Sequence, residues 1–496
     1  MSVPAVRLRE ANSAPRNPSG RYVLYWMTAA RRLHSNFALD RALELCSELR
    51  KPLLILEAVR ADYPWASDRI HRFILDGMRD NAAKASLHDL LYYPYVEPSP
   101  NAGRGLLEAL ASDACVVVTD DFPCFVLARM VAAAARKLQI SFEAADSNGL
   151  LPLRAAPQVF STAFSFRRFL HKSLPGLLSA FPAADPLPKA CLPGPPQLPH
   201  WLTSRWPIST ALLSSEHSPL DALPIDHSVL PAPLTGGYAA ASKKLLDFMT
   251  RKFNHYNEWR NEPEHNATSG LSPYLHFGHI SVHEVFTEIA RREKWNPARL
   301  ALRATGSREG WWNMSPNSEA FLDQLITWRE LAYNFCSRRE NYDRYDSLPN
   351  WALQTLEKHA RDERAHLYSL EQFERAQTHD PLWNASQTQL VRQGRIHNYL
   401  RMLWGKKILE WSRSPQEAAR IMIRLNNKYA LDGRDPNSYS GVFWCLGRYD
   451  RPWSPERPVF GTVRYMSSEN TARKFSVRNF IKRFSVTPVH LFGADE

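Results

Sequence analysis

Short apolar runs rich in β-forming residues alternate with helical patterns through the first 150 residues. Strands that alternate with helices of this length build βαβ units, and their strands lie parallel in one sheet. No GxGxxG or GxxxxGK[ST] motif follows any of the runs, so we expect no standard dinucleotide or P-loop site. Helical patterns lie between them, for example over 36–50 and 125–137. The runs are YVLYW (22–26), PLLILEA (52–58), LYYPYV (91–96), CVVVT (115–119) and ISFE (140–143).

Residues 181–235 hold 12 of the 36 prolines, which block continuous helix or sheet. From about residue 239 onward helical periodicity dominates and strand signals almost vanish. The sequence therefore predicts an α/β domain, a surface linker and an all-α domain. The predicted parts are a flexible tail (1–20), the α/β domain (21–180), the linker (181–236), the helical domain (237–485) and a second tail (486–496). The predicted helices in the last domain are 243–256, 282–294, 319–338, 388–411 and 415–429.

Composition excludes several classes of protein. No apolar run approaches the roughly 20 residues of a membrane span, and the N-terminus has no apolar signal segment. The six cysteines form no CxxC pair, which argues against a disulfide scaffold or a zinc or iron–sulphur site. The net charge of +12 favours an anionic partner such as nucleic acid, although solubility alone also explains it. We expect a cytoplasmic protein, associated with the nucleoid when bound to DNA if the source is bacterial.

Several motifs of the helical half resemble the photolyase/cryptochrome family, and most of all the class II cyclobutane pyrimidine dimer (CPD) photolyases. Each motif alone is modest, but their combination is specific and covers nearly the whole chain. The resemblance implies an antenna-type N-terminal domain, a helical FAD- and DNA-binding domain, and no metal. The motifs are SGLSPYLHFG (269–278), DPLWNA (380–385), RMLWGKKILEW (401–411), LDGRDPN (431–437) and VFGTVRYM (459–466).

The first motif resembles the flavin-phosphate segment of the family. A pyrophosphate needs backbone N–H groups and small hydroxyls that approach it without a clash. An ordinary serine N-cap is the alternative reading of this segment. The resemblance implies that FAD is held by Tyr256, Ser269, Gly270, Leu271, Ser272, Arg329, Asn398, Arg401, Asn426 and Asp432.

Around the flavin ring the resemblance implies an ion pair between Arg401 and Asp432 beside N5. A fixed cation there favours the reduced anionic flavin, and a purely structural salt bridge is the alternative. Asn426 is the candidate side chain facing N5, and Asn437 is its rival.

Trp404 and Trp411 are seven residues apart, so they lie on one face of a helix. Such aromatics are often plain core. The resemblance implies instead an electron-transfer chain with Trp404 proximal to the flavin, Trp383 in the middle and Trp411 near the surface. This chain serves photoreduction rather than repair.

A flipped-out dimer needs a pocket with apolar walls and a few polar donors. The resemblance places Trp328, Met402 and Trp444 in that pocket. Gln324 stands where class II enzymes usually carry a glutamate, and a glutamine can donate from its amide but cannot act as an acid. Because (6-4) photolyases and cryptochromes also carry glutamine here, the lesion type stays open.

Contacts to DNA are expected from two regions. The run 388–413 contains Arg392, Arg395, Arg401, Lys406, Lys407 and Arg413, which indicates either a solvated helix face or a phosphate-tracking groove. Asp450, Arg451, Trp453 and Arg464 resemble the hairpin that fills the gap left by a flipped dimer. Arg260 and Asn261 complete the predicted DNA contacts.

Residues 146–148 (Asp-Ser-Asn) depart from the Asp-x-His-Asn pattern of class II chains, so a deazaflavin antenna and an altered or empty antenna pocket both stay open. The leading hypothesis is a monomeric, light-driven lyase that splits CPDs in DNA. The alternatives are a (6-4) photolyase, a cryptochrome-like photoreceptor, and a basic helical DNA-binding protein without a cofactor.

Overall fold

The computed structural model describes residues 2–214 and 220–485. The chain forms two compact units, which we call the first and the second unit. The first unit comprises Met1–Pro157, Lys172–Leu246 and Gly270–Leu300, and the second comprises Gln158–His171, Asp247–Ser269 and Ala301–Glu496. The predicted tail 486–496 lies outside the described residues.

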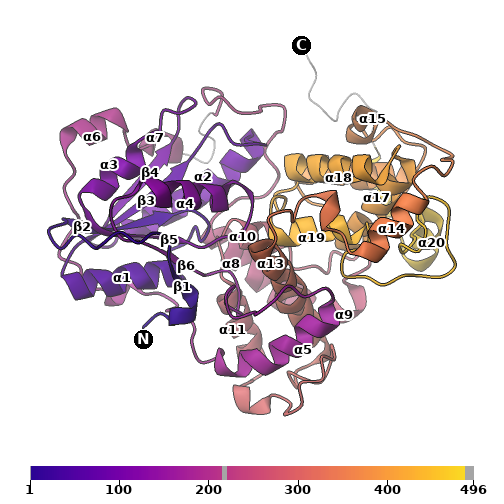
Figure 1. Ribbon diagram of the computed structural model, residues 1–496, viewed down its shortest axis with the longest axis horizontal. Helices are drawn as coiled ribbons and strands as arrows, with labels where there is room; N and C mark the ends of the chain where they lie inside the picture. The colour runs from indigo at the N-terminus through magenta and orange to yellow at the C-terminus, as the bar shows by residue number, and fades with distance from the viewer. Residues whose placement is uncertain (1, 215–219, 486–496) are drawn as a thin grey trace. The chain divides into compact units, whose positions relative to one another are not determined.

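A six-stranded sheet organises the first unit, in the order β1-β6-β5-β2-β3-β4 (Figure 1). All strands are parallel except β1, which pairs antiparallel with β6 at one edge. The predicted parallel sheet is therefore confirmed. The strands are β1 (Leu8–Glu10), β2 (Tyr22–Met27), β3 (Leu53–Val59), β4 (Leu91–Val96), β5 (Ala114–Asp120) and β6 (Phe142–Ala145).

Two apolar layers cover the faces of this sheet. Alternate residues of each strand point to opposite faces. One face packs on α1, through residues such as Leu39 and Leu45. The other face packs on α3, α4 and α6, with the buried Trp206 from the proline-rich segment among its residues. The helices that lie wholly or mostly in this unit are α1 (Phe37–Leu49), α2 (Asp68–Ala85), α3 (Leu106–Ser112), α4 (Phe125–Lys137), α6 (His200–Arg205), α7 (Thr210–Leu213), α8 (Tyr238–Asp247), α10 (Ser272–His276) and α11 (Val282–Arg292), with short 3-10 turns η1 (Ala5–Arg7), η2 (Leu174–Gly176), η3 (Leu187–Lys189) and η6 (Pro297–Arg299).

The carboxyl ends of β2 and β5, where doubly wound sheets often bind nucleotides, are closed by a side chain. The Asp120 carboxylate accepts the backbone N–H groups of Thr28, Ala29 and Ala30 at 2.7, 2.7 and 3.0 Å, and the Tyr25 hydroxyl at 2.9 Å. An acidic side chain thus takes the donors that a phosphate would need. This agrees with the missing glycine-rich motifs.

The prediction of a flexible tail over 1–20 is wrong. Residues 8–10 form β1, and the buried Arg7 donates to the carbonyls of Asp146, Gly149 and Leu150 at 3.2, 3.1 and 2.8 Å. The order of this segment could not be predicted from the sequence, because its hydrogen-bond partners lie about 140 residues further along the chain.

The unit boundaries also differ from the predicted ones. Residues 158–171 belong to the second unit, whereas the linker, 237–246 and 270–300 belong to the first. Hydrogen bonds explain why the end of the linker and the segment after α10 belong to the first unit. Gly236 N–H donates to Asp76 of α2, and Gly237 N–H donates to Nδ1 of the buried His279, both at 2.9 Å. These bonds tie the end of the linker to helix α2 and to the segment after α10.

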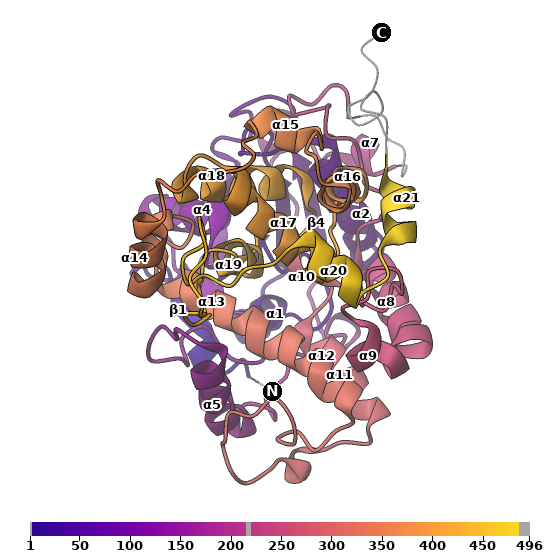
Figure 2. The ribbon, with the colours of Figure 1, turned by 90° about the vertical axis from the view of Figure 1, so that its right-hand side faces the viewer.

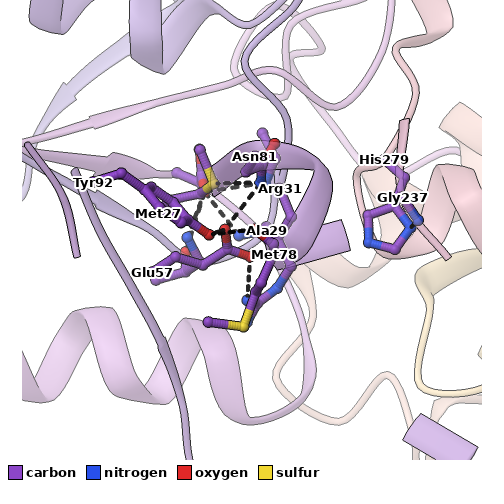
Figure 3. A network of polar contacts seen from close by, with 12 residues as sticks. Met27, Ala29, Arg31, Glu57, Met78, Asn81, Tyr92, Gly237 and His279 are labelled. Atoms are coloured by element: carbon purple, nitrogen blue, oxygen red, sulfur yellow. Dashed lines mark hydrogen bonds and ion pairs between the residues drawn. The ribbon is translucent and has the colours of Figure 1, made fainter. Parts of the chain in front are cut away.

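A buried polar network lies at the carboxyl end of β3 (Figure 3). Its centre is Glu57, which pairs with Arg31 at 2.9 Å and accepts hydrogen bonds from Asn81 at 2.9 Å and from the Tyr92 hydroxyl at 2.6 Å. A buried carboxylate is tolerated only when it is paired in this way.

Asn81→Ala is expected to destabilise the protein by about 1–3 kcal/mol, because it leaves a lone pair of the buried Glu57 carboxylate without its donor. Thermal unfolding measures the loss. Gln139→Ala removes an exposed amide from the same unit and is the control. Equal midpoints for the two variants would contradict this role of the network.

Helices are the regular secondary structure of the second unit among its described residues, as predicted, and loops connect them (Figure 2). Helix α17 packs against α16 and α18, and α21 packs on α16. The helices and helical turns are α5 (Ala163–Ser173), the π-helical η4 (Phe248–Lys252), η5 (Phe253–His255), α9 (Tyr256–Trp259), α12 (Pro316–Leu322), the π-helical η7 (Asp323–Trp328), α13 (Arg329–Arg338), η8 (Tyr345–Ser347), α14 (Asn350–Lys358), α15 (Leu370–Glu374), α16 (Pro381–Gln393), α17 (Asn398–Trp411), α18 (Pro415–Tyr429), α19 (Pro436–Trp444), α20 (Ser468–Lys474) and α21 (Arg478–Phe484).

Three predicted helices differ in detail. The predicted helix over 243–256 begins earlier, at Tyr238, and changes from α8 to the π-helical η4 and the 3-10 turn η5. The predicted helix over 388–411 is divided, because Gly394 takes the left-handed conformation that ends α16, and α17 begins only at Asn398. The predicted helix over 319–338 is continuous but contains the π-helical segment η7. Such π-helical turns are frequent at functional sites.

Candidate functional site

Helix α17 carries the charged centre of the candidate site. Arg401 Nη2 lies 2.9 and 3.1 Å from the two oxygens of Asp432, and the side chains are only 16% and 13% exposed. Arg401 Nε has no hydrogen-bond partner among the described residues. A largely buried guanidinium with a free N–H group is suited to a ligand that brings an acceptor.

Several other buried nitrogen atoms of the second unit lack a hydrogen-bond partner among the described residues, and these include His397 Nδ1, directly before α17, and Arg260 Nε. Burial lowers the pKa of His397 to about 4, so its ring is neutral at pH 7. These unsatisfied atoms are the structural observation that fits a polar cofactor such as FAD in this unit.

The two candidate asparagines differ in environment. Asn426 is buried on α18, and its amide donates to the Ser438 hydroxyl on α19. Asn437 is exposed, and its backbone N–H donates a hydrogen bond to the side chain of Asp435, the N-cap residue of α19. Only Asn426 lies in an environment that could tune a buried ring.

The predicted flavin-phosphate segment lies at a unit boundary in the chain. Ser269 ends a stretch of the second unit, and Gly270, Leu271 and Ser272 begin the next stretch of the first. Leu271 takes the N-cap position of α10 and makes no side-chain capping bond. The alternative reading of an ordinary serine N-cap is therefore wrong.

The remaining predicted flavin residues all lie in the second unit. Tyr256 is buried on α9 against Phe248 and Phe321, and burial raises the pKa of its phenol. Arg329 stacks on Tyr333 at 4.3 Å and donates to its hydroxyl at 2.8 Å. That hydroxyl donates in turn to Asp435 at 3.0 Å, and Asn398 is exposed at the start of α17.

The three tryptophans form an unbroken series of contacts. The rings of Trp404 and Trp383 lie 6.5 Å apart and are nearly parallel, at 4°. Trp383 and Trp411 lie 6.1 Å apart at 67°. The Trp383 indole donates to the Trp404 carbonyl at 3.0 Å, and the Trp404 indole donates to Gln387 at 2.9 Å. Hydrogen bonds thus fix the orientation of both inner rings.

Trp411, predicted to lie near the surface, is itself only 3% exposed. Tyr368 and His379 pack against it at 5.7 and 4.9 Å. The Tyr368 hydroxyl lies 2.7 Å from His379 Nδ1, and His379 is exposed. The aromatic contacts therefore reach the surface through Tyr368, which sequence reasoning missed because no spacing links it to Trp411.

The predicted lesion-facing residues come from three elements. Gln324 and Trp328 lie on the π-helical η7, Met402 follows Arg401 on α17, and Trp444 ends α19. Each of them is half-buried. The Gln324 side chain makes no hydrogen bond among the described residues, so its amide is available to a ligand.

Asp450 brings the predicted hairpin residues together. It pairs with Arg464 at 3.0 Å and accepts from the Trp453 indole at 3.2 Å. The Arg464 guanidinium lies 4.1 Å from the Trp453 ring and 5.5 Å from the Trp444 ring. Arg451 is exposed and lies over Trp453 at 5.1 Å.

The other predicted DNA contacts are more scattered. Arg260 and Asn261 follow α9 and are half-buried. In the basic run, Arg392 and Arg413 are exposed and Arg395 is half-buried. Lys406 and Lys407 are buried, so their prediction as part of a phosphate-tracking groove is wrong.

The residues 146–148, which depart from the expected antenna motif, make hydrogen bonds within the first unit. The Ser147 hydroxyl accepts from Phe37 N–H at 3.0 Å, and Asp146 accepts from the Leu153 and Asn148 backbone. Within 2–214 and 220–485 no cluster of three metal-ligating side chains is found. In the same ranges, no helix has the length and apolar character needed to cross a membrane.

No family model matches the chain. Curated proteins named deoxyribodipyrimidine photo-lyase do. The chain is 34% identical to that of Methanothermobacter thermautotrophicus over 97% of its own length and 98% of the relative's. It is 36% identical to that of Oryza sativa over 96% and 89%, and 32% identical to that of Potorous tridactylus over 93% and 81%.

Among solved structures, the fold is similar to that of a class III photolyase from Agrobacterium tumefaciens. The TM-score is 0.66 at 17% identity, over 95% of this chain and 89% of the other. Together with the near full-length identity to the curated relatives, this shows that the chain belongs to the deoxyribodipyrimidine photolyase family.

Proposed function

We propose that this protein is a light-dependent DNA repair enzyme that splits cyclobutane pyrimidine dimers into two pyrimidines. The observation that carries the proposal is the arrangement on α17. One helix presents Arg401, which pairs with Asp432 from the turn after α18, the half-buried Met402, and two of the three tryptophans in the contact series.

FAD, when bound, would supply the light absorption and the electron for the reaction. The unpaired Arg401 Nε and the neutral His397 would help to hold it, and the fixed charge of Arg401 would favour an anionic ring. The buried amide of Asn426 supports its choice over Asn437 as the residue facing N5. The flavin would be photoreduced by electron transfer through the three tryptophans, with Trp404 next to the flavin, then Trp383 and then Trp411.

The lesion would lie among Trp328, Met402, Trp444 and Gln324. A dimer that accepts an electron carries new negative charge on its base carbonyls, and preorganised donors stabilise such charge. Gln324 can donate a hydrogen bond to a carbonyl but cannot give up a proton. This glutamine is the specific observation that keeps a (6-4) lesion as a second candidate.

The proposal is tested with photoreduced protein and an oligonucleotide that contains one thymine dimer. Blue light should restore the thymine absorbance, and a dark control should not. A parallel oligonucleotide with a (6-4) lesion identifies the substrate. Repair of only the (6-4) lesion, or of neither lesion by flavin-containing protein, would overturn the proposal.

Arg464→Ala is expected to weaken binding to a dimer-containing duplex roughly tenfold, the equivalent of about 1.4 kcal/mol. The reason is that the side chain would replace stacking lost when the dimer flips, and this loss does not arise in a single strand. Fluorescence polarisation measures both affinities. Arg375→Ala, which removes an exposed arginine paired with Glu371, is the control. Equal losses on duplex and single strand would contradict the role.

A further inference from the structure

Lys406 is fully buried, and the proposed reaction gives it no role. It is 0% exposed on α17, and no carboxylate lies within ion-pair distance of it among the described residues. Its neighbour Lys407 is also buried but pairs with Glu410 at 2.8 Å. An ammonium group without a counter-ion is costly to bury, so its contacts need an explanation.

The first contact of Lys406 is with the end of α19. Its ammonium donates to the carbonyl of Cys445 at 2.7 Å, and Cys445 is the C-cap residue directly after Trp444. The last carbonyls of a helix have no partner within the helix and carry partial negative charge. Lys406 satisfies one of them and thereby fixes the turn that carries Trp444.

The second contact is with Trp444 itself. The Lys406 nitrogen lies 5.0 Å from the centroid of this indole, which is within cation–π distance. Arg464 lies 5.5 Å from the same ring but is neutralised by Asp450. Of these two cations beside the Trp444 ring, Lys406 is therefore the one that is not paired with a carboxylate.

We propose that Lys406 is a positioning residue for the lesion, which holds Trp444 by a helix-end hydrogen bond and a cation–π contact and keeps a positive charge behind the lesion-facing wall. The inference rests on the proposed function, in which Trp444 packs against the dimer. It also gives a source of charge stabilisation for the dimer at a site where Gln324 cannot act as an acid.

The charge state of Lys406 provides a test. Burial lowers the pKa of Lys406 to about 8, while Cys445 and Asp450 raise it and Arg464 lowers it further. The ammonium is present below that pH and is lost above it. Burial raises the pKa of the Cys445 thiol to about 11, so the thiol stays neutral across this range.

The experiment measures, in the dark, the ratio of affinities for dimer-containing and undamaged duplex at about pH 7 and about pH 9.5. For the wild-type protein we expect this ratio to fall roughly three- to tenfold at the higher pH. Lys406→Met should show the low ratio at both values, and Lys406→Arg should show the high ratio at both. Lys407→Met, which removes the adjacent buried lysine, should follow the wild type.

The outcomes separate the two proposals. A wild-type ratio near one at both pH values would overturn the proposed function and this inference with it. A high wild-type ratio that does not change with pH, or a Lys406→Met variant with the wild-type ratio, would overturn the inference alone. Loss of folding in Lys406→Met does not mimic the expected result, because the wild-type ratio should itself fall between the two pH values while Lys406→Arg should keep the high ratio at both.

Discussion

Trp383→Phe is expected to abolish the light-driven reduction of bound FAD and to leave dimer splitting by chemically reduced protein intact. Trp383 is the only described residue whose ring contacts both Trp404, at 6.5 Å, and Trp411, at 6.1 Å. Phenylalanine keeps most of the packing but is much harder to oxidise than an indole. Its introduction would therefore break the series between two intact ends.

Absorbance spectra of flavin under blue light with an external donor measure this reduction, and a chemical reductant bypasses it. Trp311→Phe is the matched control, since Trp311 is also buried in the second unit but stacks on His171. Unchanged photoreduction in Trp383→Phe, or equal losses in both variants, would show that the contact series is only core packing.

Arg401→Ala is expected to lower the free energy of unfolding by about 3–5 kcal/mol and to release bound FAD. The variant leaves the Asp432 carboxylate largely buried without the two contacts, at 2.9 and 3.1 Å, that compensate its charge. It also removes the one guanidinium of α17. Chemical denaturation measures the stability, and the flavin absorbance of the purified protein measures retention.

Arg413→Ala removes an exposed arginine just beyond α17 and should change the stability by less than about 0.5 kcal/mol. In the pair variant Arg401→Gln with Asp432→Asn, no charge is left unpaired, so much of the stability should return without the flavin. Retention of FAD by that pair variant would show that the ion pair is purely structural.

The sequence predicted the elements whose signals are local. Helix α18 has its predicted bounds, Pro415–Tyr429, because Ser414 caps its first turn and proline is favoured at that position. The five parallel strands follow from apolar runs too short to form helices. The tryptophans were found because they occur in recognisable motifs.

What the sequence did not reveal depends on contacts between distant residues. Strand β1 exists because Arg7 bonds to backbone carbonyls near residue 150. Lys406 looks like part of a charged helix face, and only the end of α19 explains its burial. Tyr368 lies beside Trp411 although 43 residues, the difference of the two numbers, separate them.

The central claim is that light drives dimer splitting with no net consumption of electrons. The most direct test counts dimers split per molecule of reduced protein under blue light, without oxygen and without an added donor. The proposed cycle predicts many dimers per protein molecule, because the electron returns after each one. A yield that stops at one dimer per protein molecule, or repair that proceeds equally in the dark, would contradict it.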